Sequence, residues 1–75
     1  MEEKIKEFLA ELRPEMDFET SEDFIEDGLI DSLDIVALMD FVEEEFGIVI
    51  PGTEIVATHF KSYATIVELI NKYKK

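Results

Sequence analysis

The stretch from Asp31 to Gly47 constrains the fold most, because it contains the whole sequence pattern of one amphipathic helix. Asp31 is a favoured N-cap residue, which places Ser32 at the first helical position and an acid, Asp34, at the third. Apolar side chains then recur at helical spacing: Ile35, Leu38, Met39, Val42 and Phe46. Gly47 follows as a C-cap. A helix with one apolar stripe buries it against other elements, so the rest of the chain must supply partners.

Two further segments show the helical period. Glu2 to Leu12 is predicted as a helix, which ends before Pro14 because the residue preceding a proline disfavours helical angles. Ser62 can cap a last helix from Tyr63 to about Tyr73. The side chains expected to face the core are Ile5, Phe8, Leu9, Leu12, Ile66, Leu69, Ile70 and Tyr73. With one short helical turn at residues 58–61, the pattern predicts an all-α fold, a small bundle of three main helices plus a short one.

The segments between the helices are predicted to be irregular. Residues 16–31 form a long loop whose apolar side chains should pack across the core: Phe18, Phe24, Ile25, Leu29 and Ile30. Gly28 can supply a turn with positive φ. Ile48 to Ile50 is β-branched, but no second strand candidate can pair with it, so we expect an extended packed segment followed by a turn at Pro51-Gly52.

Size and charge narrow the classes of function. The chain has 75 residues, which predicts one small domain over residues 1–75, and a core this small favours a carrier or binding module over an enzyme. The net charge of -12 argues against nucleic acid and anionic membranes and favours partners with basic patches. There are no cysteines, no apolar run of membrane-spanning length and no signal-peptide pattern. We therefore expect a cytoplasmic monomer with no membrane span.

The solvent face of the central helix begins at Ser32. On a helical wheel Leu33, Ala37, Asp40 and Glu44 point away from the core, with Val36 and Phe41 on the flanks. A phosphate attached to Ser32 would be stabilised by the free N–H groups and the dipole of the helix N-terminus. Capping alone also accounts for Ser and Asp at a helix start, and glutamates usually form a solvated face. An unmodified acidic protein-interaction module therefore remains an alternative.

The sequence contains no motif that indicates a catalytic or metal-binding site. We expect no catalytic residues, because the chain shows no base near Ser32, no phosphate-binding loop and no metal-ligand cluster. A calcium loop starting at Asp23 would have Ile25 at its third position and Asp34 in place of the final glutamate, so we expect no metal site. His59, the only histidine, is predicted to be a loop or partly packed residue, and Lys72, Lys74 and Lys75 form a basic end that complements a helix dipole.

From Phe24 to Ile70 the sequence resembles the acyl carrier protein family. The resemblance centres on Asp31-Ser32-Leu33 and continues through the Glu43-Glu44-Glu45-Phe46 helix end to Ile50-Pro51. It implies a four-helix bundle of acyl-carrier type, with a 4'-phosphopantetheine arm attached to Ser32 by a phosphopantetheinyl transferase that uses coenzyme A. Asp31 and Leu33 would flank the arm. Its thiol would carry an acyl group as a thioester, as in fatty acid or polyketide biosynthesis, and the protein itself would not be an enzyme.

The resemblance also implies a docking surface on the central helix. Residues expected to meet basic patches on loading ligases or synthases are Asp34, Val36, Ala37, Asp40, Glu43 and Glu44. The spacing from Gly28 to Ser32, the stretch from Pro51 to Ile55, and Phe60 are similar to D-alanyl carrier proteins and other stand-alone carriers that serve adenylating ligases. Acyl and aminoacyl cargo therefore both remain open.

Overall fold

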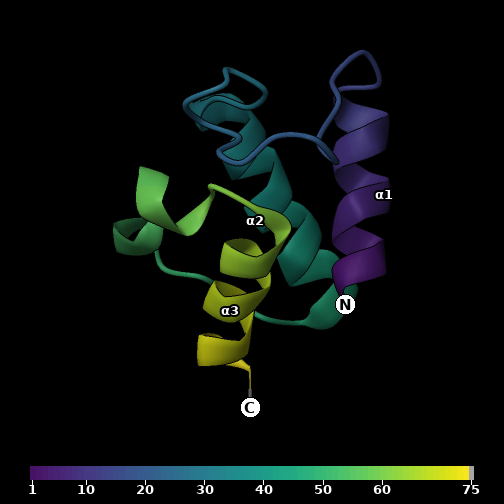
Figure 1. Ribbon diagram of the computed structural model, residues 1–75. Helices are drawn as coiled ribbons and strands as arrows, with labels where there is room; N and C mark the ends of the chain where they lie inside the picture. The colour runs from purple at the N-terminus through teal and green to yellow at the C-terminus, as the bar shows by residue number, and fades with distance from the viewer. Residues whose placement is uncertain (75) are drawn as a thin grey trace.

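The computed structural model describes residues 1–74, which contain helices and no strand (Figure 1). The α-helices are α1 (Glu2–Leu12), α2 (Ser32–Phe46) and α3 (Tyr63–Tyr73), and two 3-10 turns, η1 (Gly52–Glu54) and η2 (Ala57–His59), precede α3. The prediction of an all-α fold is confirmed, and the three main helices occupy the predicted ranges. Lys75, part of the predicted basic end, lies outside the described residues.

The apolar stripes of the three α-helices meet in one core. Its helical members are Ile5, Leu9, Ile35, Leu38, Met39, Val42, Ile66, Leu69 and Ile70, all of them predicted. Phe46 and Tyr73 are half-buried at its edge. Burial of these side chains supplies the main favourable free energy of folding, and it fixes which side of α2 is left to solvent.

The loop between α1 and α2 packs across the core as expected. Phe18, Phe24 and Ile30 are buried, whereas Ile25 and Leu29 are half-buried. The Phe24 ring meets the rings of Phe18 and Tyr63 edge-on, at centroid distances of 5.0 and 5.1 Å. The Phe24 N–H also donates to the Lys61 carbonyl at 2.7 Å, which ties the loop to the start of α3. These contacts fix the position of the loop shortly before α2 begins.

The connection from α2 to α3 begins with a left-handed glycine and an extended segment. Gly47 has φ 67°, and its N–H donates to the Glu43 carbonyl. Ile48 and Ile50 are buried and Val49 is exposed, so the predicted extended packed segment is confirmed. The short helical turn predicted at residues 58–61 is present as the 3-10 turn η2, which begins one residue earlier and ends two residues earlier than expected. It stops before Phe60, whose ring is fully buried.

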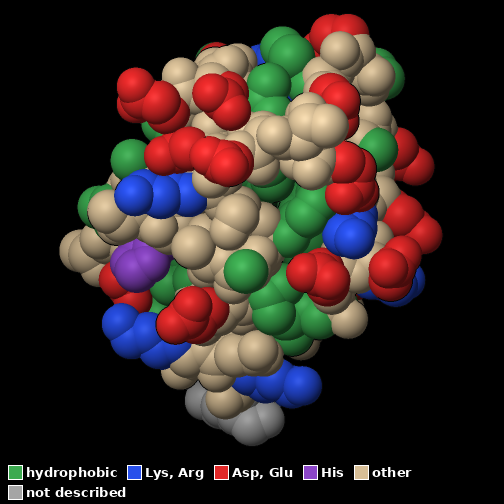
Figure 2. Space-filling view, in the orientation of Figure 1, with side chains coloured by type: hydrophobic (Ala, Val, Ile, Leu, Met, Phe, Trp, Pro, Cys, Tyr) green, Lys and Arg blue, Asp and Glu red, His purple; other side chains and the backbone are tan. Residues whose placement is uncertain are grey.

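Among the charged side chains, carboxylates are in excess, with 19 Asp and Glu against 7 Lys and Arg. Figure 2 shows acidic side chains over the top and right of this face, with the histidine at its left edge between basic side chains. Among residues 1–74, no helix is long and apolar enough to cross a bilayer.

Candidate functional site at the head of helix α2

Ser32 differs from the other two serines of the chain in the hydrogen bonding of its hydroxyl. Ser21 donates to Asp27 Oδ2 at 2.6 Å, and the Ser62 hydroxyl accepts the Thr65 N–H at 3.3 Å. Ser32 is exposed at the first position of α2, and within residues 1–74 no side-chain hydrogen bond engages its hydroxyl. Of the three serines, Ser32 is the exposed one, and Ser21 and Ser62 are half-buried.

Asp31 caps α2, as predicted. Its Oδ1 accepts the N–H groups of Leu33 and Asp34 at 3.0 and 3.1 Å. The hydrogen bond from the Asp34 N–H contributes most to lowering the pKa of Asp31 below its usual value. The Ile35 N–H is also occupied, by the Asp31 carbonyl at 3.0 Å. Of the four N–H groups from Ser32 to Ile35, the last three are thus satisfied within residues 1–74. A phosphate on Ser32 would therefore depend on the helix dipole more than on free N–H groups.

Asp34 lies on the inner side of the same turn. Its side chain is only 8% exposed, and its Oδ2 accepts the Asp31 N–H at 3.0 Å. Arg13 donates to the same oxygen from Nε at 3.1 Å and from Nη2 at 2.9 Å. This placement corrects the expectation that Asp34 faces partner enzymes. The side chain turns inward because an acid at the third helical position can reach back to the N-cap N–H, and Arg13 supplies a counter-charge.

Sequence reasoning assigned no role to Arg13. It follows the last residue of α1, and its Nη2 also lies 3.7 Å from Asp31 Oδ2. The hydrogen bond to Asp34 contributes most to raising the pKa of Arg13. One signal was present in the sequence, because Arg13 is the only Lys or Arg between Lys6 and Lys61. Many carboxylates in this acidic stretch could pair with the one cation. In the folded protein Arg13 pairs with the two at the start of α2, Asp31 and Asp34.

The outer face of α2 is apolar at its head and acidic further along. Leu33 is 78% exposed and Val36 is 49% exposed. Asp40, Glu43 and Glu44 are exposed, and Ala37 is half-buried. Two side chains at the margin turn instead to α1: the Phe41 ring stacks on Phe8 at 4.5 Å, and Glu45 pairs with Lys4 at 2.9 Å.

A groove of about 510 Å³ runs beside Ser32. Asp31 and Ser32 form its polar end, and the remaining lining is formed by Ile25, Gly28, Ile30, Ile35, Ile55, Val56 and Ala57. Gly28 has φ 72°, which allows the loop to turn at this edge. Ser32 therefore stands at the polar end of an open, largely apolar groove.

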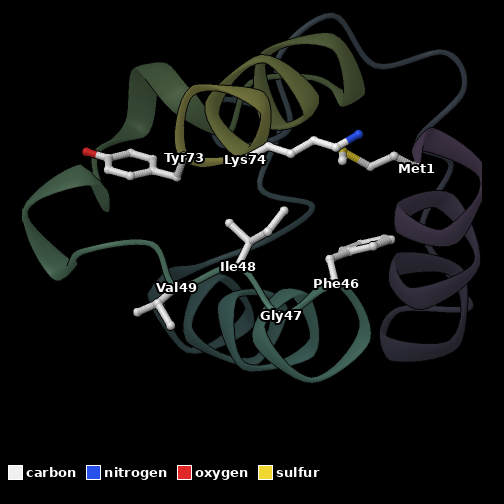
Figure 3. A pocket seen from close by; sticks show the side chains of 7 residues that line it. All are labelled: Met1, Phe46, Gly47, Ile48, Val49, Tyr73 and Lys74. Carbon is white, nitrogen blue, oxygen red and sulfur yellow. The ribbon is translucent and has the colours of Figure 1, made fainter.

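A second hollow, of about 610 Å³, lies at the opposite end of α2. Figure 3 shows Phe46, Gly47, Ile48 and Val49 on one side of it and Met1, Tyr73 and Lys74 on the other. At 1.5 Å per residue, the length of α2 separates this hollow from Ser32 by roughly 20 Å. It is therefore not part of the same site. Within residues 1–74, no cluster of three or more His, Asp or Glu side chains could hold a metal ion.

Comparison with known proteins identifies the family to which this chain is similar. A family model described as "Phosphopantetheine attachment site" matches residues 3–72. Proteins named acyl carrier protein from Rickettsia canadensis (strain McKiel) and Rickettsia rickettsii (strain Iowa) are each 39% identical over 74 residues, covering 96% of this chain and 84% of the relative. The acyl carrier protein of Rickettsia prowazekii (strain Madrid E) is 38% identical with the same coverage.

Proposed function

This chain belongs to the acyl carrier protein family, with its phosphopantetheine attachment domain, and we propose that Ser32 is the residue that carries the 4'-phosphopantetheine arm. The observation that carries the proposal is the state of the Ser32 hydroxyl, which is exposed at the first position of α2 beside an apolar groove. A phosphopantetheinyl transferase would attach the arm from coenzyme A. Residues 1–75 would act as one carrier domain, as a cytoplasmic monomer.

The residues around Ser32 fit such an arm. When bound, the arm supplies a thiol that holds cargo as a thioester. Asp31 keeps the first turn of α2 ordered, so that the attachment oxygen stays at a fixed place, and the helix dipole favours the negative phosphodiester. The groove offers apolar surface to the rest of the chain, and Leu33 offers an apolar contact outside it. The protein would present cargo and leave catalysis to its partners.

The exposed face of α2 is the proposed docking surface for those partners. Leu33 and Val36 would provide apolar contact close to the arm, with half-buried Ala37 beside them. The exposed acids Asp40, Glu43 and Glu44 would meet basic patches on the transferase and on loading ligases or synthases. The net charge of -12 would speed these encounters by long-range attraction. Asp34 is left out of this surface because its carboxylate is buried against Arg13.

We propose an acyl cargo, in keeping with the acyl carrier protein names of the relatives. An aminoacyl cargo delivered by an adenylating ligase is the second candidate, and it rests on the sequence pattern from Gly28 to Ser32 and from Pro51 to Ile55. Loading assays with an acyl transferase or ligase and with an aminoacyl-adenylating ligase separate the two, because each detects only its own thioester.

Intact mass spectrometry after incubation with coenzyme A and a promiscuous phosphopantetheinyl transferase tests the proposal. We expect the wild type to gain one phosphopantetheine and Ser32→Ala to gain none. Ser21→Ala is the matched control and should load like the wild type, because the Ser21 hydroxyl is engaged with Asp27. No gain in a folded wild-type sample would contradict the proposal and would make an acidic protein-binding module the better account.

A further inference from the structure

We propose that Glu54 is a positioning residue, which holds one wall of the groove beside Ser32 against the last turn of α3. The wall belongs to residues 51–59, which we call the strap; it contains η1 and η2. Figure 1 shows these two turns at the left of the bundle, next to α3. The relevance to cargo rests on the proposed function, but the role of Glu54 in holding the strap does not.

The backbone hydrogen bonds of the strap are all local, and the Phe60 N–H, just after it, donates to the Ala57 carbonyl at 3.1 Å. The Glu54 N–H donates to the Pro51 carbonyl at 3.0 Å, and the Ile55 N–H donates to Gly52 at 3.1 Å. The remaining strap bonds, from Val56 and His59, are equally local. Within residues 1–74, no backbone hydrogen bond joins the strap to a helix. Its position relative to α2 and α3 is therefore set by side chains.

Glu54 makes the polar attachment to α3. Its side chain is only 15% exposed, and its Oε2 accepts both the Tyr73 hydroxyl at 2.5 Å and Lys72 Nζ at 2.9 Å. The hydrogen bond from Tyr73 contributes most to lowering the pKa of Glu54 below its usual range. His59, at the end of the strap, places Nε2 3.4 Å from Glu54 Oε1. One carboxylate thus joins η1, η2 and the last turn of α3.

The groove wall lies between two anchors. Glu54 holds the strap at the end of η1, and the fully buried Phe60 holds the chain just beyond η2. The residues between them that line the groove are held weakly, since Val56 is 45% exposed, Ala57 is exposed and Ile55 is half-buried. Loss of the Glu54 attachment would let this wall move away from α2. Glu54 would then control how closely the groove encloses whatever Ser32 carries.

Glu68 provides a matched control. It lies on α3 and lines a small cleft together with Thr58, His59, Thr65, Leu69 and Lys72. It is exposed, and within residues 1–74 no hydrogen bond or ion pair engages its carboxylate. Glu68→Gln removes the same charge as Glu54→Gln from the same region, but it leaves the attachment between the strap and α3 intact.

Thiol labelling of the unmodified protein tests the proposal, because the chain has no cysteine of its own. Ile35→Cys places a thiol in the groove, where the native side chain is 5% exposed, and Ile5→Cys places one in the core on α1, where it is 0% exposed. Glu54→Gln should raise the labelling rate at position 35 by about tenfold relative to position 5. Glu68→Gln should leave that ratio unchanged.

Tyr73→Phe is the milder variant, since it removes only the hydroxyl that donates to Glu54. It should raise the labelling ratio by about threefold, and it keeps the test decisive if Glu54→Gln does not fold. Amide exchange of Val56 and His59 should quicken in the same variants, while that of Leu33 and Asp34 should not.

If the ratio of labelling rates at positions 35 and 5 were equal in Glu54→Gln and Glu68→Gln, the proposal would be overturned. A rise of the same size in the labelling rates at both positions would also overturn it, because such a rise reports global destabilisation. The measurement uses apo protein, so failure of Ser32 to accept an arm would not alter its outcome.

Discussion

Replacement of Asp34 by alanine separates a structural role from a docking role at the head of α2. The substitution removes three hydrogen bonds to Oδ2, from the Asp31 N–H, Arg13 Nε and Arg13 Nη2. It also removes an acid from the first turn of a helix, where the dipole favours negative charge. We therefore expect Asp34→Ala to destabilise the fold, whereas a docking residue would affect only partner binding.

The magnitude follows from the burial of the carboxylate. A hydrogen bond to a charged group contributes about 1.5–3 kcal/mol, but bonds that share one oxygen are not additive. The contribution from Arg13 is further reduced by solvent screening, since its side chain is 35% exposed. We expect a net loss of about 2–3 kcal/mol for Asp34→Ala. A chain of this size has roughly 4–11 kcal/mol of stability in total, so the loss is a large fraction of it.

Urea unfolding followed by circular dichroism measures this loss. The midpoint should fall by roughly 2 M urea with an unchanged slope, and the melting temperature should fall by roughly 8–24 °C. Asp40→Ala is the control, because it removes an exposed acid from the same helix, and it should stay within about 0.5 kcal/mol of the wild type. If Asp34→Ala were as stable as Asp40→Ala, the cap and the Arg13 pair would not be formed in solution, and the reasoning would be refuted.

Three further predictions concern docking, pH and salt. Leu33→Arg should leave the urea midpoint unchanged, because the side chain is 78% exposed, but lower kcat/KM for loading by the transferase at least about tenfold; unaltered kinetics would remove Leu33 from the docking surface. The pKa of Glu54 is lowered in the folded protein. The attachment of Glu54 to α3 therefore stabilises the fold fully at pH values above the ordinary pKa near 4.5, and this stabilisation is lost as the pH falls through the lower, folded-state pKa. The difference in melting temperature between wild type and Glu54→Gln should thus be largest at neutral pH and should disappear at acidic pH. A difference that does not change with pH would argue against the attachment. Added NaCl or Mg²⁺ should raise the melting temperature by relieving self-repulsion at a net charge of -12, and no shift with either would contradict this.

The parts of the fold that could be predicted are those fixed by neighbours in sequence. The limits of α2 follow from Asp31 before it, the apolar stripe within it and Gly47 after it, all inside one continuous segment. Ser62 and Thr65 mark the start of α3 by a reciprocal cap in the same local way. Ser32 could be placed at the head of α2 for the same reason.

The features that could not be predicted depend on residues far apart in the chain. Arg13 and Asp34 are 21 residues apart, so helical periodicity gives no sign that the acid is buried rather than offered to partners. Glu54 and Tyr73 are 19 apart, and their hydrogen bond depends on how the strap meets α3. Such pairings are set by tertiary packing, which a pattern of single elements does not contain.

Tandem mass spectrometry of the loaded protein after proteolysis locates the residue that carries the attached group. The chain has three serines, so the position of the added group distinguishes Ser32 from Ser21 and Ser62. We predict phosphopantetheine on the peptide that contains Ser32 and on no other. Its presence on a different serine, or its absence from folded protein after incubation with coenzyme A and transferase, would contradict the assignment of Ser32 as the attachment site.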